Sequence, residues 1–256
     1  MNSRTQQLNS LNKLLDIIDE LREKCPWDKK QTFNSLRHLT IEETFELSEA
    51  IIENSESDIR NELGDLLLHV FFYAKIASEN NSFDIGDVAN SISKKLINRH
   101  PHVYGGLSFL NEEQVKRNWE EIKLKEGNKS VLSGLPKSLP PIIKAQRIQD
   151  KVSGVGFDWE NLNQVRKKID EELLELDVEI IDKNIEKIEE VFGDLLFSMI
   201  NYARFLKIDP SMSLEKTNIK FINRFKFIED KLNLMGKKIN EMSVNEIELF
   251  WQESKF

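Results

Sequence analysis

The chain has 256 residues, of which 39% are apolar and 31% are charged, with 10 glycines and 6 prolines. This length allows one large domain or two small ones, and the composition is typical of a folded, helix-rich protein rather than a disordered or fibrous one. The formal net charge of −8 argues against nonspecific binding to nucleic acid, which needs an excess of lysine and arginine.

The single cysteine, Cys25, excludes an intramolecular disulfide framework. The N-terminal segment has no continuous apolar stretch of the signal-peptide kind, and no later stretch approaches the roughly 18 apolar residues that a membrane span needs. We therefore expect a cytoplasmic protein that binds neither membranes nor nucleic acid.

Apolar residues recur at helical spacing from Leu8 to Leu21 and predict an opening helix that ends near the sequence CPWD at residues 25–28. Further helices are predicted, in chain order, at 41–53, 59–79, 85–99, 112–125, 141–151, 162–181, 185–206, 211–235 and 243–254. No segment shows the sustained alternation of polar and apolar residues that marks a β-strand. The predicted fold class is therefore all-α.

The two halves of the chain are related by a duplication. At an offset of 129 positions, Glu43, Glu46, Gly64, Asp65, Leu66, Leu67, Tyr73 and Ala74 recur as Glu172, Glu175, Gly193, Asp194, Leu195, Leu196, Tyr202 and Ala203. Between the halves, residues 126–140 are rich in glycine, serine and proline, which is typical of a linker. We predict two tandem helical-bundle domains, 1–125 and 141–256, joined by a linker at 126–140.

Carboxylates are concentrated at two places in the first half. Glu42, Glu43 and Glu46 share one face of their predicted helix. Glu62 and Asp65, three residues apart, share one face of the next helix, so the five carboxylates converge if the two helices pair antiparallel. Like charges this close repel one another, and a cation is expected between them. Oxygen ligands without cysteine suit Mg²⁺ or Mn²⁺ rather than zinc.

Two simpler interpretations compete with a metal site. Glu43 follows Thr40 by three residues, as in a capping box at a helix start, and the glutamates within 42–53 could form a solvated face. The duplicate weighs against capping, because Ile169 precedes Glu172 by three residues and cannot cap a helix. The glutamates nevertheless recur with the same spacing to an aspartate, which favours metal binding in the first half.

A third interpretation is a carboxylate-bridged di-iron site in a helical bundle. Such a site needs a Glu-x-x-His pair on each of two helices. Here His69 follows Asp65 by four residues, and Ser198 stands at the position equivalent to His69 in the second half. This pattern disfavours a di-iron site and the oxygen chemistry that such a site performs.

The pattern EExxE followed by ExxD resembles that of the MazG family of nucleoside triphosphate pyrophosphohydrolases. The motifs that carry the resemblance are CPWDKKQTF at 25, ELGDLLLHVFFYA at 62, RHPHVYGG at 99, NWEEIK at 118, GFDW at 156 and EVFGDLLFSMINYAR at 190. They fall in the order expected for a two-domain member. The resemblance implies an all-α protein that dimerises and hydrolyses ribo- or deoxyribonucleoside triphosphates to the monophosphate and pyrophosphate with Mg²⁺. It also implies a role in removing noncanonical or surplus nucleotides.

Carried onto this chain, the resemblance implies metal ligands at Glu43, Glu46, Glu62 and Asp65. It gives catalytic roles to Glu46 and to Glu42, an outer carboxylate that would orient water. Lys95 and Arg99, four residues apart on one helix face, would bind the phosphates and take part in catalysis, although an ordinary basic helix end is the alternative. Trp119 would stack on the base or pack in the core.

The second half departs from the pattern at Val191, which stands where the first half has Glu62. Glu190 lies four residues before Asp194, within about 40° of it on a helix, so a metal could be reached in a shifted geometry. We predict a weakened or substrate-binding site here. Its expected metal ligands are Glu172, Glu175 and Asp194, and its expected substrate-binding residues are Lys168, Lys220, Arg224 and Trp251.

A noncatalytic alternative is a nucleotide-binding or regulatory helical module that keeps a relic of the site. A helical scaffold without a ligand gives no reason for a lysine and an arginine to be repeated together with the repeated carboxylates. The first half carries the complete motif, so we expect an enzyme whose chemistry takes place there.

Overall fold

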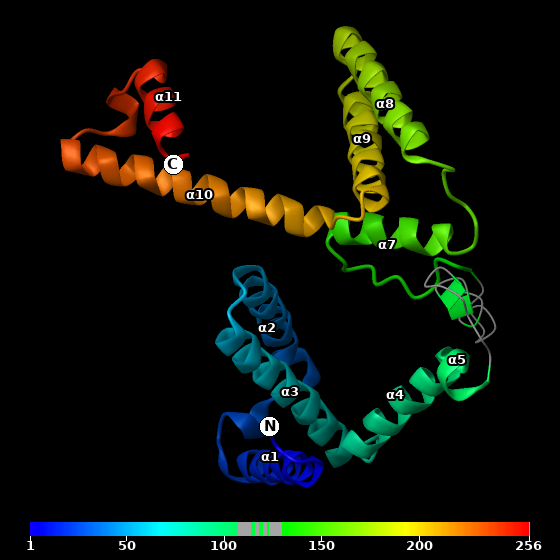
Figure 1. Cartoon of the computed structure of the whole chain (residues 1–256). Coiled ribbons are helices and arrows are strands. Elements are labelled where there is room, and N and C mark those ends of the chain that lie inside the picture. The colour runs from blue at the N-terminus through cyan, green and yellow to red at the C-terminus, as the bar shows by residue number, and fades with distance from the viewer. Residues whose placement is uncertain (107–113, 116–117, 120–121, 123–129, 256) are drawn as a thin grey trace. The chain divides into compact units, whose positions relative to one another are not determined.

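The structure of the chain is a computed structural model that describes residues 1–106, 114–115, 118–119, 122 and 130–255 (Figure 1). The regular elements in these residues are helices, without strands, which confirms the all-α prediction. None of the described helices combines the length and the apolar character that a bilayer span requires. The predicted helix at 112–125 lies mostly outside the described residues.

The chain divides into two compact units, Met1–Ser108 and Phe109–Phe256. This division agrees with the tandem duplication of the carboxylate motifs, since each unit contains one copy of them. The predicted limits of the domains and of the linker at 126–140 stay predictions, because residues 123–129 lie outside the described part of the chain.

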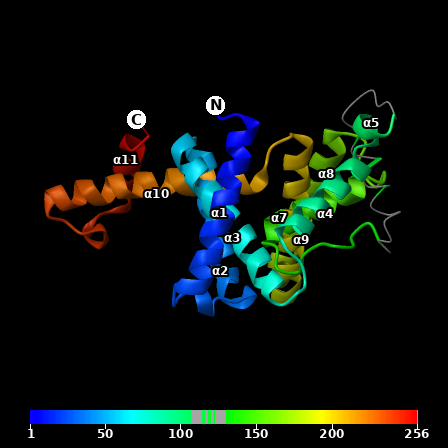
Figure 2. The same ribbon diagram turned by 90° about the horizontal axis from the view of Figure 1, so that it is seen from below.

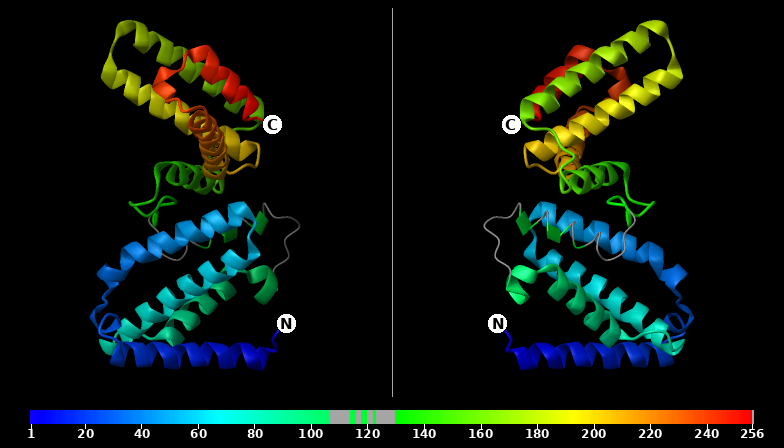
Figure 3. Two further views of the ribbon diagram at one scale, coloured as in Figure 1. Left: turned by 90° about the vertical axis from the view of Figure 1, so that its left-hand side faces the viewer. Right: turned by 90° about the vertical axis from the view of Figure 1, so that its right-hand side faces the viewer.

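The first unit is built from α1 (Arg4–Lys24), α2 (Phe33–Glu53), α3 (Glu56–Glu79), α4 (Ile85–Arg99) and the short α5 (Pro101–Tyr104), with a 3₁₀ turn, η1 (Asp28–Lys30), after α1. Figures 1 and 3 show α2 and α3 side by side, and α1 packs against α3. The buried core of this unit consists of Ile18, Leu36, Phe71, Phe72 and Ile76. Three helices therefore share one apolar core, and α4 extends beyond it.

The helix that carries the first glutamates begins at Phe33, well before the predicted start at residue 41. Thr32 caps it, because the Thr32 hydroxyl accepts a hydrogen bond from the Ser35 amide and the Ser35 hydroxyl accepts one from the Thr32 amide. Thr40 lies inside the helix, where its hydroxyl donates to the Leu36 carbonyl. The interpretation of Thr40 and Glu43 as a capping box is therefore wrong, since the helix starts upstream and its capping box is formed by Thr32 and Ser35.

Each unit contains a helical hairpin with a two-residue connection. α2 joins α3 through Asn54 and Ser55, and α8 (Leu162–Asp182) joins α9 (Ile185–Phe205) through Lys183 and Asn184. Asn54 and Lys183 end their helices in the left-handed conformation, each with φ of 55°. The two residues are separated by the same offset as the repeated carboxylates. The duplication therefore extends from the sequence to the backbone geometry of the hairpins.

The second unit places α7 (Pro141–Ser153) before its hairpin and α10 (Pro210–Met235), a 3₁₀ turn, η2 (Ile239–Glu241), and α11 (Val244–Glu253) after it. Val165 and Ile169 of α8 and Leu195 of α9 are buried. In Figures 1 and 2, α10 leads away from the hairpin, and α11 packs on α10. The carboxylates of this unit lie on the hairpin, whereas its C-terminal cations lie on α10.

An arginine fixes the loop that precedes the hairpin in each unit. In the first unit, Arg22 of α1 donates to the Asp28 carbonyl and pairs with Glu79 of α3, with 3.0 Å between Nε and Oε1. In the second, Arg204 of α9 pairs with both carboxylate oxygens of Asp158, one of them at 2.8 Å. The CPWD and GFDW motifs are therefore turns held by charged contacts to a helix of the same unit.

The core of the first unit can be tested at two neighbouring positions. Ile18 is 1% exposed and Ile17 is 42% exposed. We expect Ile18→Ala to lower the free energy of unfolding by about 2–5 kcal/mol, because it leaves a cavity, whereas Ile17→Ala should cost less than about 1 kcal/mol. Urea denaturation followed by circular dichroism measures both, and equal losses would contradict the placement of the core.

Candidate active site

Three carboxylates meet on the α2–α3 hairpin. One carboxylate oxygen from each of Glu43, Glu62 and Asp65 lies within 4.8 Å of the other two. Glu43 comes from the middle of α2, and Glu62 and Asp65 come from successive turns of one face of α3. The structure thus brings together side chains from both predicted carboxylate clusters, as the antiparallel pairing of two helices requires.

Mutual repulsion and burial change the acidity of this group. Burial raises the pKa of Glu43, and the charges of Asp65, Glu46 and Glu62 raise it further. Burial also raises the pKa of Glu62, with further rises from the charges of Glu46 and Asp65 and from a hydrogen bond with Glu46. Glu46 therefore adjoins the group through Glu62, while Glu42 is exposed on α2 and contributes through its charge on Glu43.

No ion pair among the described residues neutralises Glu43, Glu62 or Asp65. Glu43 and Glu62 are half-buried, and a half-buried carboxylate without a counter-ion is costly because it loses hydration without gaining an opposite charge. The donors are all carboxylate oxygens, which are the ligands that Mg²⁺ and Mn²⁺ prefer. The chemistry of the donor set therefore fits a divalent cation.

His69 is a site neighbour that sequence reasoning considered only as an iron ligand. Its side chain is 7% exposed, and its Nδ1 has no hydrogen-bond partner in the described part of the chain. Burial lowers the pKa of His69, against an opposing effect of the Asp65 charge, and the imidazole lies one turn below the carboxylates. The signal in the sequence is its position four residues after Asp65, on the same face of α3.

A polar contact between the two hairpin helices lies beyond His69. The His69 and Tyr73 rings are tilted with centroids 6.4 Å apart, and the Tyr73 hydroxyl lies 2.6 Å from that of Thr40. Phe33 stacks on Tyr73 from the start of α2. These contacts fix α2 against α3 and thereby fix the distance between Glu43 and the carboxylates of α3.

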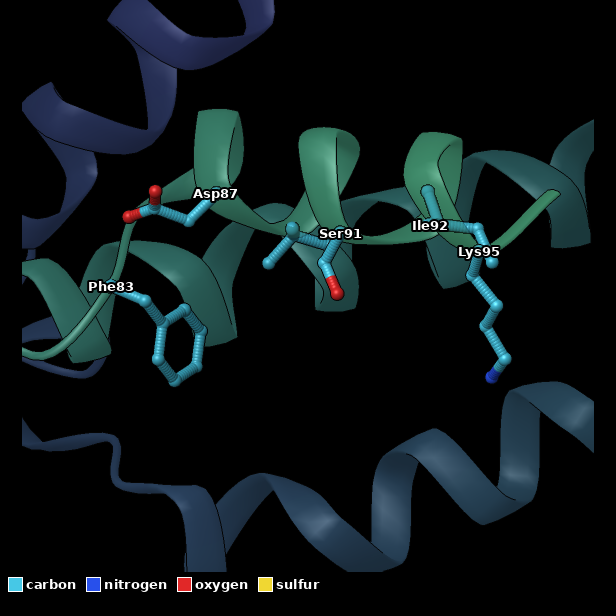
Figure 4. Close-up of a pocket in the computed structure, with 6 residues that line it drawn as sticks. Phe83, Asp87, Ser91, Ile92 and Lys95 are labelled. Carbon is cyan, nitrogen blue, oxygen red and sulfur yellow. The ribbon is translucent and has the colours of Figure 1, made fainter. Parts of the chain in front are cut away.

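The predicted phosphate-binding residues lie on α4. Lys95 is exposed and makes no ion pair with any described residue, and Arg99 is half-buried at the end of the helix. Figure 4 shows Lys95 on the same side of α4 as Ser91 and Ile92, where a pocket of about 480 Å³ is lined by Phe83, Asp87, Val88, Ser91, Ile92 and Lys95. Trp119 is helical and half-buried. The roles of these residues stay predictions.

The second hairpin presents the same positions differently. Glu172 is buried and its Oε1 lies 2.8 Å from the Lys168 ammonium, whereas Glu175 and Asp194 are exposed. Val191, at the position of Glu62, is buried. Within the described residues, no group of three ligand atoms comparable to that of the first unit forms in this hairpin. The second metal site therefore stays a prediction.

The C-terminal residues predicted to bind substrate form a cluster of their own on α10 and α11. The Phe221 and Trp251 ring centroids are 5.1 Å apart, and the Arg224 guanidinium lies 5.6 Å from the Trp251 centroid. Lys220 is exposed on the same helix as Arg224. No described hydrogen bond or ion pair joins Lys220 or Arg224 to Glu172 or Asp194, so their common site also stays a prediction.

Comparisons with known proteins identify the family. A model of the MazG nucleotide pyrophosphohydrolase domain matches residues 31–104, a range that includes the whole α2–α3 hairpin and α4. The chain is 40% identical to a protein of Escherichia coli strain K12 described as a nucleoside triphosphate pyrophosphohydrolase, over 97% of this chain and 98% of that protein. The chain therefore belongs to the MazG family of nucleotide pyrophosphohydrolases, which are hydrolases.

Two further relatives also match both halves of the chain. A nucleoside triphosphate pyrophosphohydrolase/pyrophosphatase of Thermotoga maritima is 41% identical over 94% of each protein. A protein of Bacillus subtilis described as uncharacterized protein YabN is 42% identical over 93% of this chain and 50% of its own length. Both units are thus part of the resemblance, in agreement with the tandem duplication.

Removal of one charge from the carboxylate group should change the pH dependence of stability. Because the pKa of Glu43 is raised on folding, the folded protein holds more protons than the unfolded one between the two values, and stability falls as pH rises through that window. We expect wild type to lose more stability than Glu43→Gln as the pH rises above the ordinary glutamate pKa of about 4.3. Thermal melts without divalent cations test this. Glu49→Gln, an exposed site on α2, should keep the wild-type slope, and a wild-type slope in Glu43→Gln would contradict the expectation.

Proposed function

We propose that this chain is a Mg²⁺-dependent nucleoside triphosphate pyrophosphohydrolase, which converts ribo- or deoxyribonucleoside triphosphates and water to the monophosphate and pyrophosphate. Mn²⁺ is the expected substitute for Mg²⁺. The observation that carries the proposal is the group of Glu43, Glu62 and Asp65, which gathers three carboxylates without a counter-ion. Relatives that share about 40% of their residues with the chain and are described by this activity support it.

In the proposed reaction, the metal ligands lie on α2 and α3, and the phosphate-binding residues lie on α4. Glu43, Glu62 and Asp65 would hold the cation, with Glu46 beside them. When bound, Mg²⁺ supplies positive charge that lets a triphosphate approach acidic helices and that activates water. Glu46, whose hydrogen bond with Glu62 contributes to the raised pKa of Glu62, would take a proton from an attacking water.

The positive charges for the substrate come from α4. Lys95, which has no ion pair among the described residues, is available to bind phosphate oxygens and to stabilise the charge that develops during transfer. Arg99 lies one helical turn further along the same face and has the same proposed role. Recognition of the triphosphate through metal and cations places few demands on the base. We therefore propose that the enzyme accepts a broad range of nucleotides and that its role is to remove surplus or noncanonical ones.

We also propose that the protein acts as a homodimer. The hairpins expose large apolar side chains at matched positions: Phe45, Leu63 and Val70 are 59%, 52% and 44% exposed, and Leu174, Phe192 and Met199 are 66%, 51% and 53% exposed. Burial of such a repeated apolar surface against a second copy would remove it from water. Two hairpins packed face to face make a four-helix bundle, which is a common helical architecture.

The activity can be tested with a panel of ribo- and deoxyribonucleoside triphosphates and Mg²⁺, with pyrophosphate and orthophosphate measured separately. We expect pyrophosphate from wild type and a loss of roughly 100-fold or more in Glu46→Gln, because the proton acceptor is removed. Glu49→Gln, on the same helix, is the matched control and should retain activity. Loss only in Glu175→Gln would place the chemistry in the second unit. Nucleotide binding without any pyrophosphate would favour a noncatalytic module.

The proposed dimer can be tested by sedimentation equilibrium. The double variant Val70→Lys/Met199→Lys should sediment as a monomer, because it places a charge at the matched apolar position of each hairpin. Leu8→Lys, at a 57% exposed position on α1, should leave the mass unchanged. A wild type that sediments as a monomer, or a double variant with the wild-type mass, would contradict the proposed interface.

A further inference from the structure

The two hairpins differ at the residue one helical turn before the first glutamate ligand. In the first unit this residue is Leu39, which packs against the apolar core. In the second unit it is Lys168, whose ammonium lies 2.8 Å from Glu172 and 3.6 Å from Glu171. The offset between Leu39 and Lys168 is that of the duplication. An apolar residue and a cation thus occupy equivalent places beside equivalent glutamates.

The equivalent glutamates of the two hairpins, Glu43 and Glu172, also differ in how deeply they are buried. Glu172 is 4% exposed, whereas Glu43 is only half-buried. A carboxylate can be buried this deeply when an opposite charge also donates a hydrogen bond to it. Lys168 provides both, since its ammonium lies 2.8 Å from the Glu172 carboxylate. Glu43 has no such partner and depends on a cation from outside the chain.

The remaining positions of the second hairpin are also poor ligands. Val191, where the first unit has Glu62, is 8% exposed and offers no oxygen. Glu190, the nearest carboxylate that could replace it, lies 2.9 Å from the Lys187 ammonium and is paired with it. Of the three predicted ligands in this hairpin, Glu175 and Asp194 keep exposed carboxylates without an ion pair among the described residues. Among the described residues, the second hairpin therefore offers Mg²⁺ fewer carboxylate oxygens than the group of three that meets in the first unit, and Mg²⁺ needs its oxygen ligands in a strict geometry.

We infer that Lys168 is a built-in counter-cation of the second hairpin, in the place that a divalent cation takes in the first, so that this chain binds catalytic metal through its first unit only. The inference rests on the proposed metal-dependent function of the first unit. A metal ion at the second hairpin would have to displace Lys168 from Glu172 and would then gain few ligands. In the second unit the ion pair of Lys168 with Glu172 takes the place of a metal ion, so only the first unit binds one.

Binding of Mn²⁺ to the full-length protein, followed by the electron paramagnetic resonance of free Mn²⁺, tests this inference without any assay of activity. We expect one class of tight sites per chain. Asp65→Asn should weaken it about tenfold or more, because a direct ligand is lost. Asp194→Asn, the same change at the equivalent residue of the second unit, should leave it unaltered. Circular dichroism confirms that both variants keep their helices.

The reverse experiment places metal ligands in the second hairpin. The double variant Lys168→Leu/Val191→Glu copies the residues of the first unit and should add a second class of Mn²⁺ sites. If this variant loses its helices, Val191→Glu alone provides a second measurement: Lys168 still pairs with Glu172, so this variant should keep one class of sites. A second class of sites in that variant would overturn the inference.

The outcomes separate the inference from the proposed function. Weaker Mn²⁺ binding in Asp194→Asn, or two classes of sites in wild type of which each single variant removes one, would overturn the role of Lys168. Unchanged Mn²⁺ binding in Asp65→Asn would instead overturn the proposed metal site of the first unit.

Discussion

The main constraint on the first unit is a group of carboxylates whose negative charges are not balanced by any ion pair among the described residues. Glu43, Glu62 and Asp65 are held within a few ångströms of one another by the packing of α2 on α3, and no described cation neutralises them. The apolar contacts of the hairpin and the contact of Tyr73 with Thr40 hold the carboxylates in place against their mutual repulsion. A site that costs stability in this way is typical of functional residues, whose charges await a ligand.

The second unit also buries a glutamate, and there a lysine of the chain itself balances the negative charge. Its buried glutamate pairs with Lys168 on the same helix, and an apolar side chain, Val191, replaces one carboxylate. Duplication thus gave two hairpins with one backbone design, in which Asn54 and Lys183 turn the chain in the same left-handed conformation. The chemistry of the two hairpins diverged through side chains that leave this backbone unchanged.

Loops and helices on either side of the hairpins are positioned by specific polar contacts. Arg22 and Arg204 fix the loops before the hairpins by charged contacts. α4 and α10 each begin at an aspartate cap, Asp84 or Asp209, and carry the repeated lysine and arginine away from the core. The repeated lysine and arginine therefore lie on a different helix from the repeated carboxylates in each unit.

The sequence alone determined most of the described helices, the duplication and the family, because helical periodicity, an exact repeat of Glu43 and Asp65 and the order of the motifs are local or one-dimensional signals. It misplaced the start of α2, since Thr40 mimics a cap that Thr32 provides. Only the tertiary structure decided that oxygens from two helices meet, that His69 is buried below them and that Lys168 pairs with Glu172. Burial and ion pairing depend on which faces pack together, and helical spacing does not specify this.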